Sequence, residues 1–147
     1  MAGGIFDPDF NQLPASIPIF PLPNALLLPG GQLPLNIFEP RYLAMVNYAL
    51  ATPTKLIGML QPHGSKKEFE AQHDQELFDT GCAGRLSFFQ ESDDGRLVIA
   101  LNGVCRFRLL SHEPHPKDFL VADVDWQPFV NDLRVDVSTL DRAPLIE

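Results

Sequence analysis

Basic residues are scarce in this 147-residue chain, which has 11 Lys and Arg against 19 Asp and Glu and a formal net charge of −8. Nucleic-acid-binding proteins gain most of their affinity by neutralising phosphates with Lys and Arg, so this balance opposes nucleic acid as a partner. A local basic patch stays open. No Lys or Arg precedes Arg41. Because a secretory signal needs a basic segment ahead of its apolar stretch, the sequence predicts a cytoplasmic protein.

Long apolar runs and cysteines are also scarce. Runs such as residues 25–28 fall far short of the roughly 20 residues that cross a bilayer, so no membrane partner is expected. The only two cysteines, Cys82 and Cys105, are 23 positions apart and form no CxxC pair. A disulfide framework has no purpose in a chain of this size, and both side chains are predicted to be reduced thiols.

The sequence lacks the common catalytic motifs: no P-loop, GxSxG, HExxH or GxGxxG occurs. Ser65 and Lys66 are neighbours in a polar stretch, whereas a Ser/Lys dyad needs a rigid pair and a buried lysine. His112 and His115 form an HxxH near Cys105, but two prolines break its geometry and no fourth ligand has the usual spacing. We therefore expect no enzyme activity, no metal and no cofactor.

Proline dominates the first 40 residues, which contain eight of the 14 prolines. Because proline removes a backbone donor and blocks helix interiors, this part is predicted to form short strands at residues 17–20, 25–28 and 32–38. Pro40 fits the first helical position, and apolar residues then recur at helical spacing, which predicts a helix over residues 40–51. That apolar stripe consists of Tyr42, Met45, Val46, Ala49 and Leu50.

The rest of the chain alternates apolar and polar residues with period 2, which is typical of half-buried strands. A polar stretch at residues 61–79 is predicted to be a surface loop. We expect seven or eight short strands, including an antiparallel meander, and one helix that plugs a small, partly open barrel or folded sheet. The strands expected after the helix are residues 55–60, 82–90, 96–102, 104–111 and 119–126, with Gly103 separating two of them.

Two adjacent aromatic residues, Phe88 and Phe89, must point to opposite faces of their strand. If Asp94-Gly95 forms a two-residue hairpin loop, Phe88 lies opposite Leu101 on a core face and Phe89 lies opposite Ala100. Phe89, Val98 and Ala100 would then form an exposed apolar strip for a client chain. The alternative is that another strand or the proline-rich segment covers this strip. The remaining aromatic residues expected in the core are Phe20, Phe38, Phe107 and Trp126.

Charged residues occur at two further conspicuous places. Glu39 and Arg41 flank Pro40 and are predicted to form a charge pair at the start of the helix, with a binding role as the alternative. Arg106 and Arg108 alternate with apolar residues and share one face. They are predicted to solvate the sheet, with binding of an acidic chain as the alternative.

Several blocks of the sequence carry a resemblance to a known family: residues 17–22, 27–30, 33–42 with Met45, 81–84 and 103–107. Together they resemble the N-terminal domain of ATP-dependent Lon proteases. The resemblance covers residues 14–127, and its first part, residues 17–45, is long enough to be specific. It implies a pseudo-barrel related to PUA-like folds. Residues 128–147 are then a tail or the start of a helical subdomain.

The resemblance implies a non-catalytic, cofactor-free module that binds unfolded or flexible polypeptides, because the ATPase and Ser/Lys peptidase of Lon are separate domains. Recruitment of a protease or ATPase as a second partner is left open. The alternative function, RNA binding by analogy with PUA-like folds, is opposed by the acidic charge.

Overall fold

The computed structural model describes residues 10–23, 25–62 and 79–133. Most of the loop expected at residues 61–79, Ser65 and Lys66 included, lies outside the described residues. The predicted class, mainly β with one α-helix, is confirmed. Its elements are η1 (Phe10–Gln12), β1 (Ser16–Pro21), β2 (Gln32–Ile37), α1 (Pro40–Leu50), β3 (Leu56–Leu60), β4 (Thr80–Glu91), β5 (Leu97–Pro114), β6 (Leu120–Asp125) and η2 (Gln127–Leu133).

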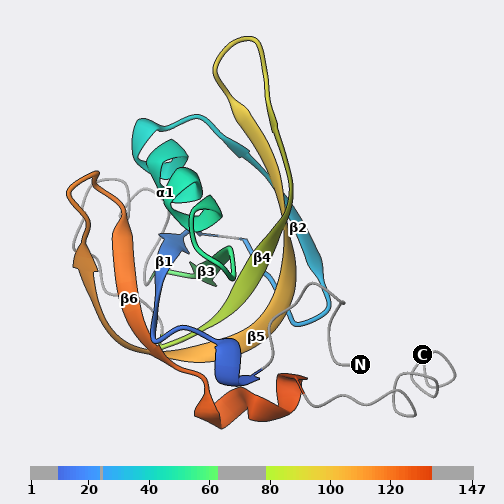
Figure 1. Cartoon of the computed structure of the whole chain (residues 1–147), viewed down its shortest axis with the longest axis vertical. Helices are drawn as coiled ribbons and strands as arrows, with labels where there is room; N and C mark the ends of the chain where they lie inside the picture. The colour runs from blue at the N-terminus through green and yellow to red at the C-terminus, as the bar shows by residue number, and fades with distance from the viewer. Residues whose placement is uncertain (1–9, 24, 63–78, 134–147) are drawn as a thin grey trace, which may run out of the picture.

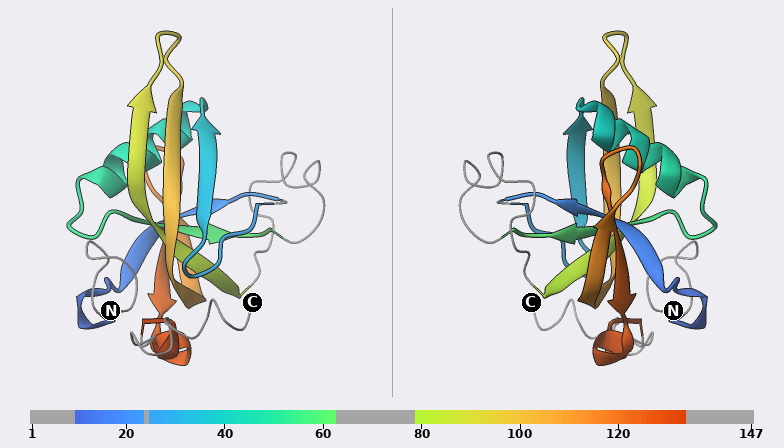
Figure 2. Two further views of the ribbon diagram at one scale, coloured as in Figure 1. Left: turned by 90° about the vertical axis from the view of Figure 1, so that its right-hand side faces the viewer. Right: turned by 90° about the vertical axis from the view of Figure 1, so that its left-hand side faces the viewer.

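The six strands of the described part of the chain form one curved sheet in the order β2-β5-β4-β3-β1-β6 (Figure 1). The meander β4-β5-β6 is antiparallel, as predicted, whereas β1 runs parallel to β3. Strand β6 also pairs with the C-terminal part of β5, so the sheet curls back on itself into a barrel-like shape. Figure 2 shows the β4–β5 hairpin projecting beyond the rest, with β2 on the outer side of β5.

Within the described residues the structure has six strands, fewer than the seven or eight expected, for two reasons. Residues 25–28 form no strand, although Leu27 is buried. Gly103 does not end a strand but lies inside the 18-residue β5, where its N–H donates to the Gly31 carbonyl at 2.8 Å. A Cβ atom on Gly103 would collide with the backbone of Leu28. This glycine therefore marks a close approach of two backbones and not a turn.

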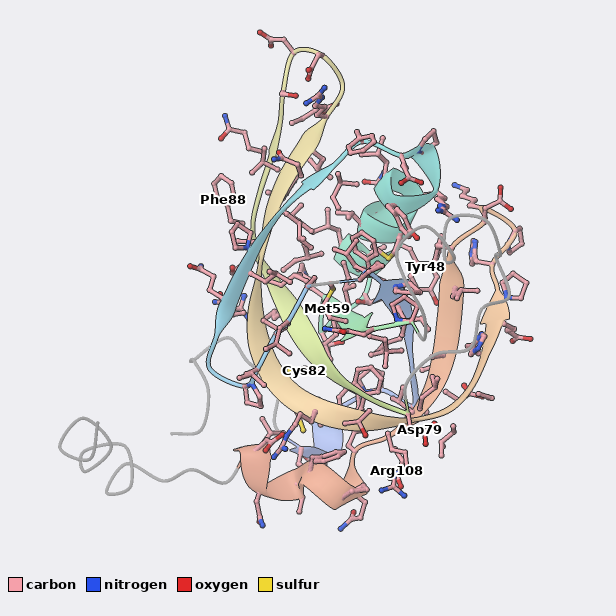
Figure 3. All side chains as sticks on the ribbon, turned by 180° about the vertical axis from the view of Figure 1, so that it is seen from behind. Tyr48, Met59, Asp79, Cys82, Phe88 and Arg108 are labelled. Atoms are coloured by element: carbon pink, nitrogen blue, oxygen red, sulfur yellow. The ribbon has the colours of Figure 1, made fainter. Side chains whose placement is uncertain are left out.

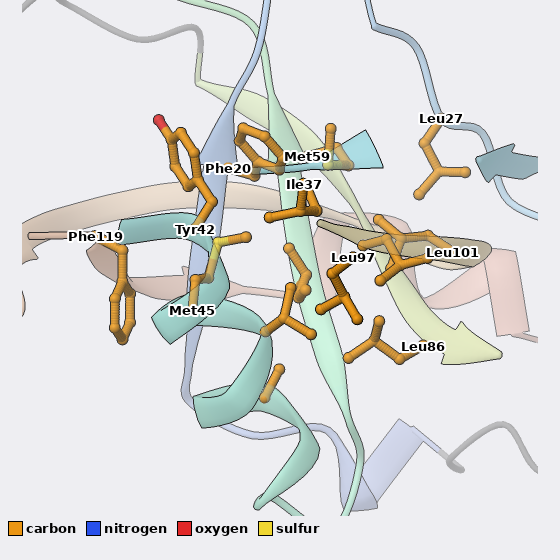
Figure 4. Packing of buried hydrophobic residues seen from close by; sticks show 14 of the residues in the cluster. Phe20, Leu27, Ile37, Tyr42, Met45, Met59, Leu86, Leu97, Leu101 and Phe119 are labelled. Carbon is orange, nitrogen blue, oxygen red and sulfur yellow. The ribbon is translucent and has the colours of Figure 1, made fainter. Parts of the chain in front are cut away.

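Helix α1 follows from the sequence as predicted. Pro40 occupies its first turn, Glu39 is extended at φ −73° and ψ 134°, and the apolar stripe faces inward. Tyr42, Met45 and Val46 are buried against strands of the sheet (Figure 4). Burial of such a stripe provides most of the stability of a helix this short.

The buried apolar residues form two clusters, one under α1 and the other around Phe107 and Trp126. Phe20, Phe107 and Trp126 are buried as predicted, but the expectation for Phe38 and Phe88 is wrong because both are exposed. Segment η2 packs its partly buried Phe129 and Leu133 against the second cluster. The domain boundary at residue 127 stays a prediction, and residues 134–147 lie outside the described part.

Among the described residues, no helix is long and apolar enough to cross a membrane.

Candidate polypeptide-binding site

A largely apolar groove lies where β2 passes into α1. It has a volume of about 220 Å³. The turn Phe38-Glu39-Pro40 forms the entrance of the groove. The extended Glu39 and the following Pro40 bend the chain away from the sheet, which leaves Phe38 outside. Phe38 is 64% exposed. The groove is lined mainly by Phe20, Leu22, Leu35, Ile37, Phe38 and Tyr42.

The floor of the groove is aromatic and uncharged. The rings of Phe20 and Tyr42 stack with their centroids 4.2 Å apart. Burial raises the pKa of Tyr42 above its ordinary value, an effect that nearby Glu39 reinforces and Arg41 opposes. The phenol therefore stays neutral at physiological pH.

The two charged residues at the rim of the groove neutralise each other. Arg41 Nε donates to Glu39 Oε2 at 3.1 Å, which confirms the predicted charge pair. The Arg41 guanidinium also lies 4.7 Å from the centre of the Tyr42 ring. A half-exposed pair of this kind contributes at most about 1 kcal/mol to stability. Its chemical consequence is that the rim offers a ligand apolar surface and no net charge.

The predicted strip of Phe89, Val98 and Ala100 does not lie on one face. Phe88 pairs with Ala100 and Phe89 pairs with Ile99, so Phe88 shares the outer face with Val98 and Ala100. Figure 3 shows Phe88 projecting from the outside of the sheet. Phe89 lies on the same side as Ile99, and Ala100, which was expected to be exposed, is buried. Both rings are half exposed, at 49% for Phe88 and 54% for Phe89.

Two details of the hairpin cause this difference. The Ser92 N–H donates to the Arg96 carbonyl at 2.8 Å, so the loop has three residues, with Gly95 at φ 84°. The strands are thereby displaced by one residue relative to a two-residue loop. A bulge at Ser87 then shifts the register by one more residue, so that Leu86 pairs with Leu101 on the core face while Phe88 lies outside, and the Ser87 hydroxyl donates to the Ala100 carbonyl at 3.3 Å.

Arg106 and Arg108 are both exposed, as predicted. Arg106 also binds its own chain: Nε and Nη2 lie 3.0 and 2.8 Å from the carboxylate oxygens of Asp132. Burial alone would raise the pKa of Asp132, but the hydrogen bonds from Arg106 outweigh it and hold the pKa below its ordinary value. Arg106 is therefore occupied in fastening η2 to β5 and is poorly placed to bind an acidic chain.

Among the described residues, His115 packs on an aromatic ring and both cysteines are buried. His115 stacks on Phe119 at 4.4 Å between ring centroids. Cys82 and Cys105 are free and buried, and burial raises the pKa of each to about 12. Within residues 10–23, 25–62 and 79–133, no group of three or more His, Cys, Asp or Glu is arranged to hold a metal ion.

The groove itself is a feature that the sequence reasoning missed, because it assigned Phe38 to the core. The signal was present in the alternation of β2. Leu33, Leu35 and Ile37 are at least partly buried, so the next even position, Phe38, must point outward.

Comparison with known proteins gives a consistent set of similarities. Residues 16–143 match the family model of the ATP-dependent protease La (LON) substrate-binding domain. The chain is 30% identical over 140 residues to a Lon protease of Roseiflexus castenholzii, covering 93% of this chain and 16% of that protein. It is 27% identical over 125 residues to a Lon protease of Flavobacterium johnsoniae, covering 83% and 15%. The chain thus spans only a small part of these relatives.

Solved structures show the same likeness. The crystal structure of a Lon N-terminal domain protein from Xanthomonas campestris superimposes with a TM-score of 0.60 at 30% identity, covering 76% of this chain and 59% of that one. The N-terminal domain of a Lon protease from the Mycobacterium avium complex gives a TM-score of 0.58 at 14% identity, covering 76% and 54%. The second likeness concerns the fold alone.

Proposed function

Because the chain belongs to the family of ATP-dependent protease La (LON) substrate-binding domains, we propose that it is a non-catalytic module that binds unfolded or flexible polypeptides. The family confirms the resemblance that residues 14–127 indicate and makes the chain a substrate-recognition type of domain. Polypeptide as the ligand, and the absence of catalysis, are the proposed part.

The observation that carries the proposal is the groove at the β2–α1 turn. It combines an exposed phenylalanine, Phe38, an aromatic floor, and a charge pair that is satisfied internally. Apolar surface with few directional polar groups accepts many sequences, which is what a module for unfolded chains requires. Its size fits one or two apolar side chains of a client and not a whole folded partner.

A second contact surface is proposed on the outer face of the hairpin. Phe88 and Val98 are exposed there, and Ala100, which is only 9% exposed, lies between Phe88 and Pro34 of the neighbouring strand β2. These residues form an outer strip, which replaces the combination predicted from the sequence, in which Phe89 took the place of Phe88. An elongated client could contact the strip while one of its side chains occupies the groove.

Binding of a reduced, carbamidomethylated lactalbumin, followed by fluorescence anisotropy, tests the proposal. Phe38→Ser should weaken binding about five- to thirtyfold, because removing an interface aromatic costs about 1 to 2 kcal/mol. Leu110→Ser is the matched control, since Leu110 is 61% exposed on β5 and does not line the groove. Equal effects of the two substitutions, or no binding by the wild-type chain, would refute the proposal.

Salt dependence separates this function from the RNA-binding alternative. The similarities found concern Lon proteins and give that alternative no support. Binding to phosphates must weaken steeply between 50 and 200 mM salt, whereas apolar binding of a polypeptide changes little. A steep loss of affinity, together with binding of single-stranded RNA, would favour the alternative.

A further inference from the structure

Strand β2 ends the sheet and presents one backbone edge that no described residue pairs. In the sheet order, β2 has β5 as its single neighbour, and Figure 2 shows it on the outer side of β5. An unpaired edge is a row of backbone donors and acceptors that another extended chain can satisfy. Which of these groups face outward can be derived from the hydrogen bonds of β5.

The backbone of β5 fixes the orientation of β2. Gly103 exchanges hydrogen bonds with Gly30 and Gly31 on the side of β2, at 2.9 and 2.8 Å. The Ala100 carbonyl accepts from Ser87 of β4, on the opposite side. Polar groups of successive residues in a strand alternate between its two neighbours, so odd-numbered residues of β5 in this region face β2 and even-numbered ones face β4.

Ala100 is the partner of Pro34. Because Ala100 directs its polar groups to β4, Pro34 directs its own carbonyl away from β5, and its missing N–H costs the sheet nothing. By the same alternation, Gln32 and Asn36 also direct their backbone groups outward. The free edge therefore offers three carbonyls and two N–H groups. The two N–H groups, on Gln32 and Asn36, are about 13 Å apart at the rise of an extended chain.

The apolar groove lies at the C-terminal end of this edge, where residues 35–37 of β2 line it. Its lining residues come from β1 and the segment after it, from β2 and from the start of α1, and β5 contributes none of them. A strand added beside β2 would place every second side chain on the inner face, next to Leu35 and Ile37 and into the groove. The side chains between them would lie outside, beside Pro34 and Asn36.

We infer that an extended polypeptide segment with alternating apolar and polar uncharged residues binds here by adding a strand to β2. This inference rests on the proposed function and specifies its ligand. Backbone hydrogen bonds supply affinity with little dependence on sequence, and the groove selects apolar residues at alternate positions. The internally paired Glu39 and Arg41 leave the groove without net charge, so a neutral segment is preferred.

The probe is a seven-residue peptide, Thr-Val-Thr-Phe-Thr-Val-Thr, in three forms. The first form is unmodified. The second is N-methylated at the backbone amides of its threonines, and the third is N-methylated at the backbone amides of its valines and phenylalanine. Only one set of amides can face β2, so one methylated form should bind at least tenfold more weakly while the other stays within about twofold of the unmodified peptide. Weaker binding of the peptide methylated at its threonines indicates antiparallel addition. Weaker binding of the peptide methylated at its apolar residues indicates parallel addition.

The protein side of the interface is followed by amide hydrogen exchange. Binding should slow exchange at Gln32 and Asn36, whereas Leu33 and Leu35 already face β5 and should change little. Pro34→Ala adds a third outward N–H and should tighten binding about two- to tenfold, the value of one net hydrogen bond. Sedimentation of this variant checks that it remains in the same state of association as the wild type.

The outcomes separate the inference from the function on which it rests. One outcome is that the peptide binds with the same affinity in both methylated forms and without slower exchange at the Gln32 and Asn36 amides. In that case strand addition is wrong and the binding function stands. If none of the peptide forms binds and the lactalbumin does not bind either, the proposed function itself fails. If the two amides become protected in the free protein as its concentration rises, a second copy occupies the edge, and the inference is overturned.

Discussion

Met45→Ala is the sharpest test of how the helix is held to the sheet. Met45 is fully buried in the first core cluster, on the face of α1 that meets β1 and β3. The substitution removes three heavy atoms beyond Cβ, which corresponds to a transfer free energy of about 2.5 kcal/mol. A residual cavity raises the expected loss to about 3 to 4 kcal/mol. For a domain of this size the melting temperature should fall by about 10 to 15 °C.

Urea unfolding measures this loss with two probes. Circular dichroism follows the secondary structure, and fluorescence follows Trp126, the single tryptophan, which lies in the other core cluster. The two transitions should coincide if both clusters unfold together. Asn47→Ala is the control, because Asn47 is exposed on the same helix and its replacement should change stability by no more than about 0.5 kcal/mol. A Met45→Ala midpoint indistinguishable from that of Asn47→Ala would refute the assigned helix face.

Two further predictions concern η2 and the hairpin. Because its pKa is lowered in the folded state, Asp132 should stabilise the protein above pH 4 and lose that effect as the pH falls through the folded pKa. Asp132→Asn should cost about 1 to 2 kcal/mol in urea unfolding at pH 7, and a difference that persists unchanged at pH 3 would contradict this. Phe88→Ser should weaken lactalbumin binding more than Phe89→Ser, with stability losses of about 1 kcal/mol for both; the reverse order would show that the outer strip is not a contact surface.

Local periodicity was enough to predict most elements. The helix stripe of Tyr42, Met45 and Val46 and the alternation of β6 depend on neighbouring residues, and the structure retains them. The local sequence did not predict the structure of residues 25–28. They have the composition of a strand, yet Gly30 and Gly31 tie the adjacent backbone to Gly103 of β5 across the molecule.

The candidate site was harder to predict, because it depends on single-residue offsets. Asp94-Gly95 is compatible with a loop of two or of three residues, since glycine at positive φ suits both. Choosing the shorter loop reversed the faces of Phe88 and Phe89. The bulge at Ser87 has no clear sequence signature. Phe38 was a different error, because the alternation of β2 already indicated its exposure.

The pairing of β1 with β6 has a consequence for how the chain folds. Ser16 pairs with Asp123, and the Trp126 indole donates to the Pro14 carbonyl at 2.7 Å across 112 positions of sequence. Contacts between such distant segments require a large loss of chain entropy before any favourable contact energy is gained. This requirement slows folding. During synthesis, β1 can pair with β6, its second neighbour in the sheet, only after nearly all of the described chain has been made. Until then its outer backbone groups stay open to other chains.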